Sequence, residues 1–130
     1  NWVEGWVDWN MVLDKKGGPN WANNWCIAPV IADPEKDEVY FTPLYYVMAH
    51  FSKYFRPNSR RIKCTSTSND VLVTAVENTD GSIAIAVLNE QNTPLTFNLK
   101  IGSQSQIMEI EEKALQTILV NGKSILKKAN

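Results

Sequence analysis

The sequence predicts an α+β chain that is rich in strands, with one helix ahead of a mostly antiparallel β-sandwich. Apolar residues recur with the period of a helix over residues 43–55. After the polar connector 56–61 they recur at every second position, as they do in strands. This spacing is typical of an antiparallel sandwich. Six strands and one hairpin turn are expected, at residues 62–65, 71–77, 82–88, 94–100, 106–110 and 114–120, with the turn at 78–81.

The first segment predicts a strand over residues 2–9 that ends in a glycine-rich loop. Its side chains alternate between two faces, and Trp9 lies at the carboxyl end. Gly17, Gly18 and Pro19 then exclude regular structure. Four of the five tryptophans fall in residues 6–25, interleaved with asparagines. Two interpretations stay open: a surface that stacks on sugar rings, or a buried aromatic cluster with asparagines fixing its turns.

The segment between this loop and the helix predicts an extended piece and a charged turn. Pro29 lacks a backbone donor, so the apolar residues 26–32 are expected as an edge strand or an extended connection. Residues 33–38 carry four carboxylates, and we interpret them as a solvated turn. A metal-binding loop would need an ordered ligand set and a glycine bend, and both are missing.

The helix is expected to begin at Pro43, with Thr42 as its N-cap, and to run for about three turns. Its apolar stripe consists of Leu44, Val47, Met48, Phe51 and Phe55. The opposite side is expected to carry Tyr46, His50 and Lys53. His50 is the only histidine, and we interpret it as a packed or surface residue and not as a general base.

Within the sandwich, residues 83–88 are apolar on both faces and predict a central strand. Residues 95–100 alternate as a half-exposed strand does. Six strands are few for a sandwich, so exposed edges and self-association through them are expected. The tail from Ser124 is expected to fray.

Five ordered motifs point to a known family. They are Gly5-Trp-Val-Asp-Trp-Asn10, the run Gly17-Gly-Pro-Asn-Trp21, the pair Asn24-Trp25, the run Ile27-Ala-Pro-Val-Ile-Ala-Asp33, and residues 43–53. Together they resemble the C-terminal part of glycoside hydrolase family 30, in its glucosylceramidase-like branch. The likeness is dense over residues 1–60 and looser to about residue 120.

The resemblance implies the last strand and helix of a (β/α)8 (TIM) barrel over residues 1–58, and a side β-sandwich over residues 59–130. A whole barrel needs about 250 residues, so this part would be a barrel fragment. Family members hydrolyse β-glycosidic bonds with retention, using two glutamates at the ends of the fourth and seventh barrel strands. Both would lie upstream of Asn1, so we expect no catalytic residue in this chain and no activity from it alone.

The chain's own carboxylates do not replace that pair. Retaining glycosidases need two carboxyl groups about 5 to 5.5 Å apart. Glu4 and Asp8 would be roughly 13 Å apart along a strand. The pairing of Asp8 with Asp14 is not excluded by geometry, but neither residue stands at a catalytic position of the family.

The resemblance does imply substrate-binding residues. Trp9 matches a tryptophan that forms a wall of the sugar pocket, Asn24 matches a polar residue at the same mouth, and Trp25 stands where an aromatic faces the aglycone. Weaker candidates are Asp8, Asn10, Trp21 and Asn20, with roles in fixing the loop. Trp6, on the other strand face, is expected to pack. No metal and no cofactor are expected.

Composition narrows the partners. Thirteen basic and fourteen acidic residues give a formal charge of −1, which leaves no electrostatic footprint for nucleic acid or an anionic membrane. Cys26 and Cys64 are expected as thiols and not as a disulfide framework. The partners themselves are implied by the family resemblance: a β-linked glycoside, glucoside or glucosylceramide-like, and the upstream remainder of the enzyme. A secreted, periplasmic or lysosome-like location fits the family, and the sequence itself assigns none.

Two other hypotheses remain at this point. In the first, the chain is a non-catalytic sugar-binding module that binds glycan with its sandwich. In the second, it is a structural piece that associates through its edges. The first lacks an aromatic platform, because residues 62–120 contain no tryptophan and one aromatic residue, Phe97.

Overall fold

The computed structural model describes residues 3–122 and 124–129, and for residues 124–129 it describes only the backbone. The chain forms two compact units, residues 1–49 and residues 50–130. The single described helix, α1 (Pro43–Tyr54), begins in the first unit and ends in the second. The strand-rich chain with one helix that the sequence predicts is confirmed.

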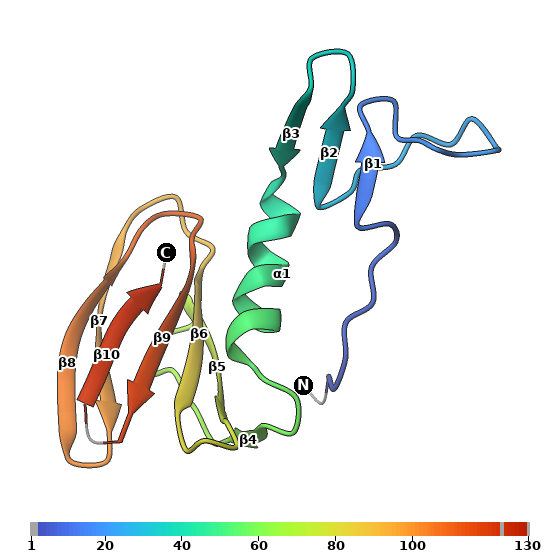
Figure 1. Cartoon of the computed structure of the whole chain (residues 1–130). Coiled ribbons are helices and arrows are strands. Elements are labelled where there is room, and N and C mark those ends of the chain that lie inside the picture. The colour runs from blue at the N-terminus through green and yellow to red at the C-terminus, as the bar shows by residue number, and fades with distance from the viewer. Residues whose placement is uncertain (1–2, 123, 130) are drawn as a thin grey trace. The chain divides into compact units, whose positions relative to one another are not determined.

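The first unit contains a three-stranded sheet in the order β1-β2-β3 (Figure 1). Its strands are β1 (Val12–Asp14), β2 (Val30–Asp33) and β3 (Glu38–Phe41). β1 and β2 are parallel, and β2 and β3 form an antiparallel hairpin around the charged turn 34–37. The predicted turn is confirmed, but its solvated character is wrong for Asp33, which is 3% exposed because its carboxylate pairs with Lys15.

Two expectations for this unit are wrong. The first is the strand over residues 2–9: residues 3–10 are irregular with exposed side chains, residue 2 lies outside the described residues, and pairing begins at Val12. A strand exists only where a neighbour satisfies its backbone groups, and alternation of side chains does not supply that neighbour. The second is the edge position of residues 26–32. β2 is the central strand of the sheet. Pro29 does not prevent this, because β2 begins one residue after it, and the missing amide of Pro29 therefore removes no hydrogen bond between strands.

The helix has the predicted start. The Tyr45 amide donates to the Thr42 carbonyl at 3.0 Å, and Pro43 is the first helical residue. The Thr42 hydroxyl, expected to cap the helix, instead donates to the Ala28 and Pro29 carbonyl oxygens at 3.0 and 3.1 Å. It therefore ties the helix start to the segment before β2.

His50 does not lie on a free side of the helix. Its Nδ1 is 2.8 Å from the Thr117 hydroxyl, and the residue is partly buried. His50 is expected opposite the apolar stripe with Tyr46 and Lys53, and at His50 this side of the helix contacts β9 (Leu115–Asn121) of the sandwich. A packed histidine, the broader expectation, is confirmed.

The second unit is a sandwich of a five-stranded and a two-stranded antiparallel sheet, in the orders β10-β9-β6-β5-β4 and β7-β8 (Figure 1). The strands are β4 (Arg60–Ile62), β5 (Val71–Glu77), β6 (Ile83–Asn89), β7 (Leu95–Ile101), β8 (Gln104–Ile110), β9 (Leu115–Asn121) and β10 (Ser124–Ala129). All six predicted strands form. The first lies about two residues earlier than expected, because its partner, Val76 to Glu77 at the end of β5, faces Arg60 and Arg61.

The expectation of a frayed tail is wrong. Residues 124–129 form β10, which pairs with β9, so the sandwich has seven described strands where six were expected. Gly122, with a φ of 59°, permits the tight reversal between the two strands.

The core lies between the two sheets and is centred on β6 and β9, as predicted for residues 83–88. Its buried side chains are Ala75, Ile85, Val87, Met108, Ile110, Ile118 and Val120. The other face of β6 is also covered, since Ala84 and Ala86 are buried beside Thr117, the partner of His50. On this face Thr117 contacts His50 of α1.

Candidate functional site

The loop between β1 and β2 projects from the first unit (Figure 1) and carries most of the residues predicted to bind sugar. It starts in a turn built on Asp14. The Asp14 amide donates to the Gly18 carbonyl at 2.7 Å, and Asp14 Oδ1 accepts from the Gly18 and Lys16 amides at 2.9 and 2.8 Å. These two amides, Gly18 first, hold the pKa of Asp14 below its usual value.

Gly17 closes the loop. Its φ is 73°, and a Cβ atom placed on it would lie 2.5 Å from the Cys26 nitrogen and 3.0 Å from Trp25 Cδ1. The two ends of the segment 18–25 are therefore in contact, as in a compact Ω-type loop. Asn20 braces the interior: its Nδ2 donates to the Gly17 carbonyl and its Oδ1 accepts from the Asn24 amide, each at 3.2 Å.

The predicted sugar-binding side chains are exposed. The exposed fractions are 75% for Trp9, 98% for Trp21 and 65% for Trp25. Asn24 is also exposed, and its side-chain amide has no hydrogen bond within the part of the chain that the structure describes. The loop thus presents flat apolar faces beside a free donor and acceptor, the combination that suits a hydroxylated ring.

The structure brings some of these residues together and leaves others apart. Asn24 and Trp25 share the closed loop with Trp21. Trp9 precedes β1 and, within residues 3–122, has no aromatic partner. The Trp9 amide donates to Asp8 Oδ1 at 2.8 Å, so Asp8 shapes the bend at Trp9, and Asn10 follows as an exposed residue.

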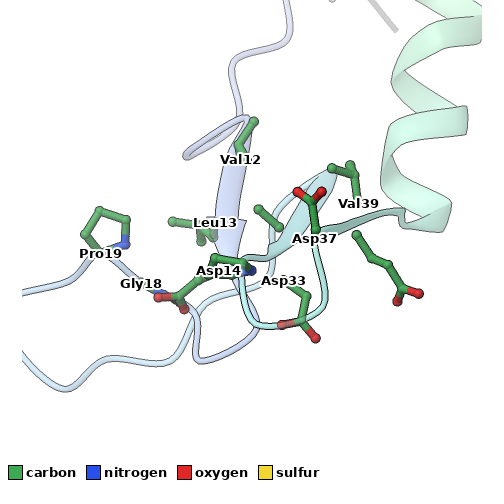
Figure 2. Close-up of a pocket in the computed structure, with 11 residues that line it drawn as sticks. Val12, Leu13, Asp14, Gly18, Pro19, Asp33, Asp37 and Val39 are labelled. Atoms are coloured by element: carbon green, nitrogen blue, oxygen red, sulfur yellow. Dashed lines mark hydrogen bonds between the residues drawn. The ribbon is translucent and has the colours of Figure 1, made fainter.

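A separate shallow pocket of about 380 Å³ lies at the carboxyl ends of β1 and β2 (Figure 2). Val12, Leu13 and Val39 form apolar walls, and the carboxylates of Asp14, Asp33 and Asp37 surround them. Trp9, Asn24 and Trp25 do not line it. We place the candidate site on the aromatic loop and not in this pocket, because two of the pocket's carboxylates already have partners within the chain. Asp14 accepts hydrogen bonds from backbone amides, and Asp33 accepts one from a lysine.

That lysine is Lys15. Its Nζ lies 3.1 Å from Asp33 Oδ1 and 2.7 Å from Glu35 Oε2, which joins the loop to the β2–β3 turn. Glu35, then Asp33, raise the pKa of Lys15. Burial acts to raise the pKa of Asp33, but Lys15 and the amides of Glu35 and Lys36 together hold it below its usual value. Sequence inspection misses this ion pair, because opposite charges 18 residues apart carry no periodic signal.

Other reactive groups are outside the loop. Cys26 and Cys64 are free and partly buried, as predicted, and burial raises the pKa of the Cys64 thiol. The described residues contain no cluster of three or more His, Cys, Asp or Glu side chains suited to a metal ion. Within that same part of the chain, we find no helix with the length and apolar character that a membrane crossing requires.

Comparison with known families shows which protein family the two parts of the chain belong to. The model of the glycosyl hydrolase family 30 TIM-barrel domain matches residues 1–55, and that of the family 30 β-sandwich domain matches residues 58–118. The chain belongs to glycosyl hydrolase family 30. The family 30 chain thus combines barrel and sandwich sequence in the family's order, and the resemblance drawn from its motifs is confirmed.

Several curated relatives of this family 30 chain are named glucosylceramidases. It is 40% identical over 99 residues to the lysosomal acid glucosylceramidase of Mus musculus, covering 74% of this chain and 19% of that protein. It is 38% identical over 118 residues to putative glucosylceramidase 4 of Caenorhabditis elegans, covering 89% and 22%. The chain therefore spans about a fifth of the length of the curated relatives it matches.

Solved structures agree with this assignment. SrfJ from Salmonella typhimurium superposes with a TM-score of 0.85 and 27% identity, over 89% of this chain and 26% of that one. An endo-β1,6-glucanase superposes with a TM-score of 0.75 and 26% identity, over 84% and 25%. The barrel-fragment and sandwich elements of the family 30 chain thus recur in these two solved proteins.

Proposed function

We propose that this chain is the C-terminal portion of a retaining β-glycosidase of the glucosylceramidase type, and that both catalytic glutamates lie upstream of Asn1. The observation that carries the proposal is the ordered match to the two family 30 domains, together with relatives about four times as long as this chain. The substrate class is a β-linked glucoside such as a glucosylceramide, because relatives that match over 74% and 89% of this chain are named glucosylceramidases.

In this proposal the chain supplies part of the substrate pocket. Trp9 stacks on the apolar face of the sugar ring, and Asn24 donates to and accepts from sugar hydroxyls. Trp25 packs on the aglycone, where a flat hydrophobic surface is needed. The exposure of these side chains supports their roles, since side chains buried in a core would be unable to contact a ligand.

The remaining candidates hold these three in place. Asp8 fixes the backbone at Trp9, Asn10 follows it at the start of the sheet, and Trp21 extends the aromatic surface of the loop. We further propose that the functional boundary lies at residue 58, with the barrel part before it and the sandwich after it. The two family models change between residues 55 and 58, which supports that division.

The proposal is tested in the chain extended upstream with its native sequence, assayed on an aryl β-glucoside. We expect Trp9→Ala and Asn24→Ala each to lower kcat/KM by about tenfold or more, since each removes a contact to the sugar. Tyr46→Ala is the matched control, because Tyr46 is an exposed aromatic on α1 outside the loop. Equal activity in all three variants would contradict the assigned roles.

The second candidate, a sugar-binding sandwich, has less support. Phe97, the single aromatic residue of positions 62–120, packs against the core and is not free to form a platform. All five tryptophans lie in residues 2–25, so tryptophan fluorescence reports on the first unit alone. Saturable binding of oligosaccharide by calorimetry without any change of that fluorescence would favour the sandwich.

A further inference from the structure

The strongest feature that the proposed function leaves unexplained is the ion-pair bridge made by Lys15. The residue belongs to the turn that starts the loop 14–26, directly after β1. Its two acidic partners belong to the turn between β2 and β3. Because β1 and β2 are parallel, their carboxyl ends lie at the same edge of the sheet, so a side chain of this length spans the two turns.

The bridge is anchored on a buried group. The Asp33 side chain is 4% exposed, and it meets Lys15 Nζ through both carboxylate oxygens, at 3.1 and 3.2 Å. Asp33 Oδ1 also accepts from the Glu35 amide at 3.2 Å, and the Asp33 carbonyl accepts from the Lys36 amide. A buried carboxylate that loses its cation is costly, whereas an exposed pair such as Lys15 with Glu35 contributes little. The Asp33 contact is therefore the one that holds the bridge.

On the loop side, the bridge acts on a structure that has few other ties. Asp14 and Gly17 close its base, and Asn20 braces its interior through two bonds of 3.2 Å. Between Gly18 and Pro29 the chain forms no helix and no strand. The base thus sets where Trp21, Asn24 and Trp25 stand relative to the sheet.

We propose that Lys15 is a positioning residue: by pairing with Asp33 and Glu35 it fixes the base of the glycine-rich loop and so the placement of Trp25 and Asn24 toward the leaving-group part of a glycoside. This inference rests on the proposed function for its substrate. The bridge itself stands on the geometry of the two turns. Lys15 touches no substrate in this scheme and acts only through the loop.

Amide hydrogen exchange of the 130-residue chain tests the bridge without any substrate. We expect Lys15→Met to speed exchange of the amides in residues 16–26 by about fivefold, because the loop base opens more often. Lys15→Arg keeps the cation and should restore slow exchange. Lys36→Met is the matched control, because Lys36 is an exposed lysine of the partner turn without an ion pair among the described residues.

Asp33→Asn completes a double-mutant cycle. If the two side chains act as one unit, the double variant exchanges no faster than the faster of the single variants. Unchanged exchange in Lys15→Met, or an effect equal to that of Lys36→Met, overturns the proposal. Far-UV circular dichroism of each variant shows that the sheets are intact, so a global loss of folding is not mistaken for an open loop.

The upstream-extended chain supplies the second readout. Lys15→Met should raise KM about threefold to tenfold for a glycoside with a large apolar aglycone, with kcat nearly unchanged and with rescue by Lys15→Arg. Unaltered KM in an active enzyme overturns the positioning role. If the extended parent chain has no glycosidase activity, the proposed function fails while the exchange experiment still decides whether Lys15 fixes the loop.

Discussion

Gly17 occupies a left-handed backbone conformation and lies directly against the Cys26 backbone. These are two separate demands on one residue. Any L-residue would strain at a φ of 73°, and any Cβ would press on backbone atoms that are unable to move aside as a flexible side chain does. The closed shape of the loop 14–26 therefore depends on the absence of one side chain.

The first prediction follows from that contact. Gly17→Ala should destabilise the first unit by about 2 kcal/mol or more, because strain and clash add. Denaturant unfolding followed by tryptophan fluorescence measures it. Gly81→Ala is the control: its φ is 79° but no atom lies within 4 Å of the added Cβ, and it belongs to the second unit. A fluorescence transition of Gly17→Ala that coincides with the parent's would contradict the close approach.

His50 makes stability depend on pH. Burial lowers its pKa in the folded chain below the ordinary value of 6.5. Its contribution is therefore fully present above about pH 6.5, and it is lost as pH falls through the lowered folded-state pKa. We expect the unfolding temperature of the sandwich, followed by circular dichroism, to fall as pH decreases from about 7.5 to 5.

His50→Gln should flatten that dependence, because the chain has no other histidine and its carboxylates titrate mainly at lower pH. Gln retains a group able to bond with the Thr117 hydroxyl, so the fold is kept. An equally steep decline in the variant would show that other groups cause it.

At the scale of elements, Asn78 joins the helix to the sandwich. It lies in the β5–β6 hairpin and is 4% exposed. Its Nδ2 donates to the Tyr54 carbonyl at 3.1 Å, and its Oδ1 accepts from the Arg56 amide at 3.1 Å. A side chain from a hairpin thus satisfies the backbone groups that the end of α1 leaves open. Within the second unit, this fixes where the helix stops.

The third prediction concerns the loss of this cap. Asn78→Ala should destabilise the second unit by about 1–3 kcal/mol, because partly buried backbone groups at the end of α1 lose their partners. Chemical unfolding followed by far-UV circular dichroism measures the change. Asn92→Ala, at an exposed asparagine of the loop before β7, should be neutral. Equal stability of the two variants would contradict the capping role.

The elements also show what local pattern can predict. The turn at Gly81, the start of α1 at Pro43 and the two-sided burial of β6 each follow from short stretches of sequence, and all three were predicted correctly. The strand at residues 3–9 and the tail β10 were not, because pairing depends on a neighbour that the stretch itself does not encode. The same holds for the site. The glycines and asparagines of the loop predicted it from a short stretch of sequence. The Lys15–Asp33 ion pair could not be predicted in this way, because it joins two turns that are distant in sequence.

At the scale of the molecule, the first unit carries many large apolar side chains in contact with solvent. Trp9, Trp21, Trp25, Tyr40 and Phe41 are among them. Exposed surface of this kind marks a place where another surface binds. In our account the upstream barrel of the same enzyme covers much of it, and the substrate meets the rest.

The fourth prediction concerns the 130-residue chain in solution. Left without that cover, it should self-associate through the first unit, because apolar surface and the free edges of β1 and β3 are costly in water. Light scattering over a dilution series measures this, and the upstream-extended chain is the control. A chain that remains monomeric at high concentration would contradict the idea that these faces need a partner.

The central claim is that the chain holds pocket residues without the catalytic pair, and one assay tests it most directly. Purified 130-residue chain and chain extended upstream with its native sequence are compared on an aryl β-glucoside. We predict no turnover above the blank from the first, and turnover from the second that is abolished when the two upstream glutamates are replaced by glutamine. Clear, saturable turnover by the 130-residue chain alone would contradict the account.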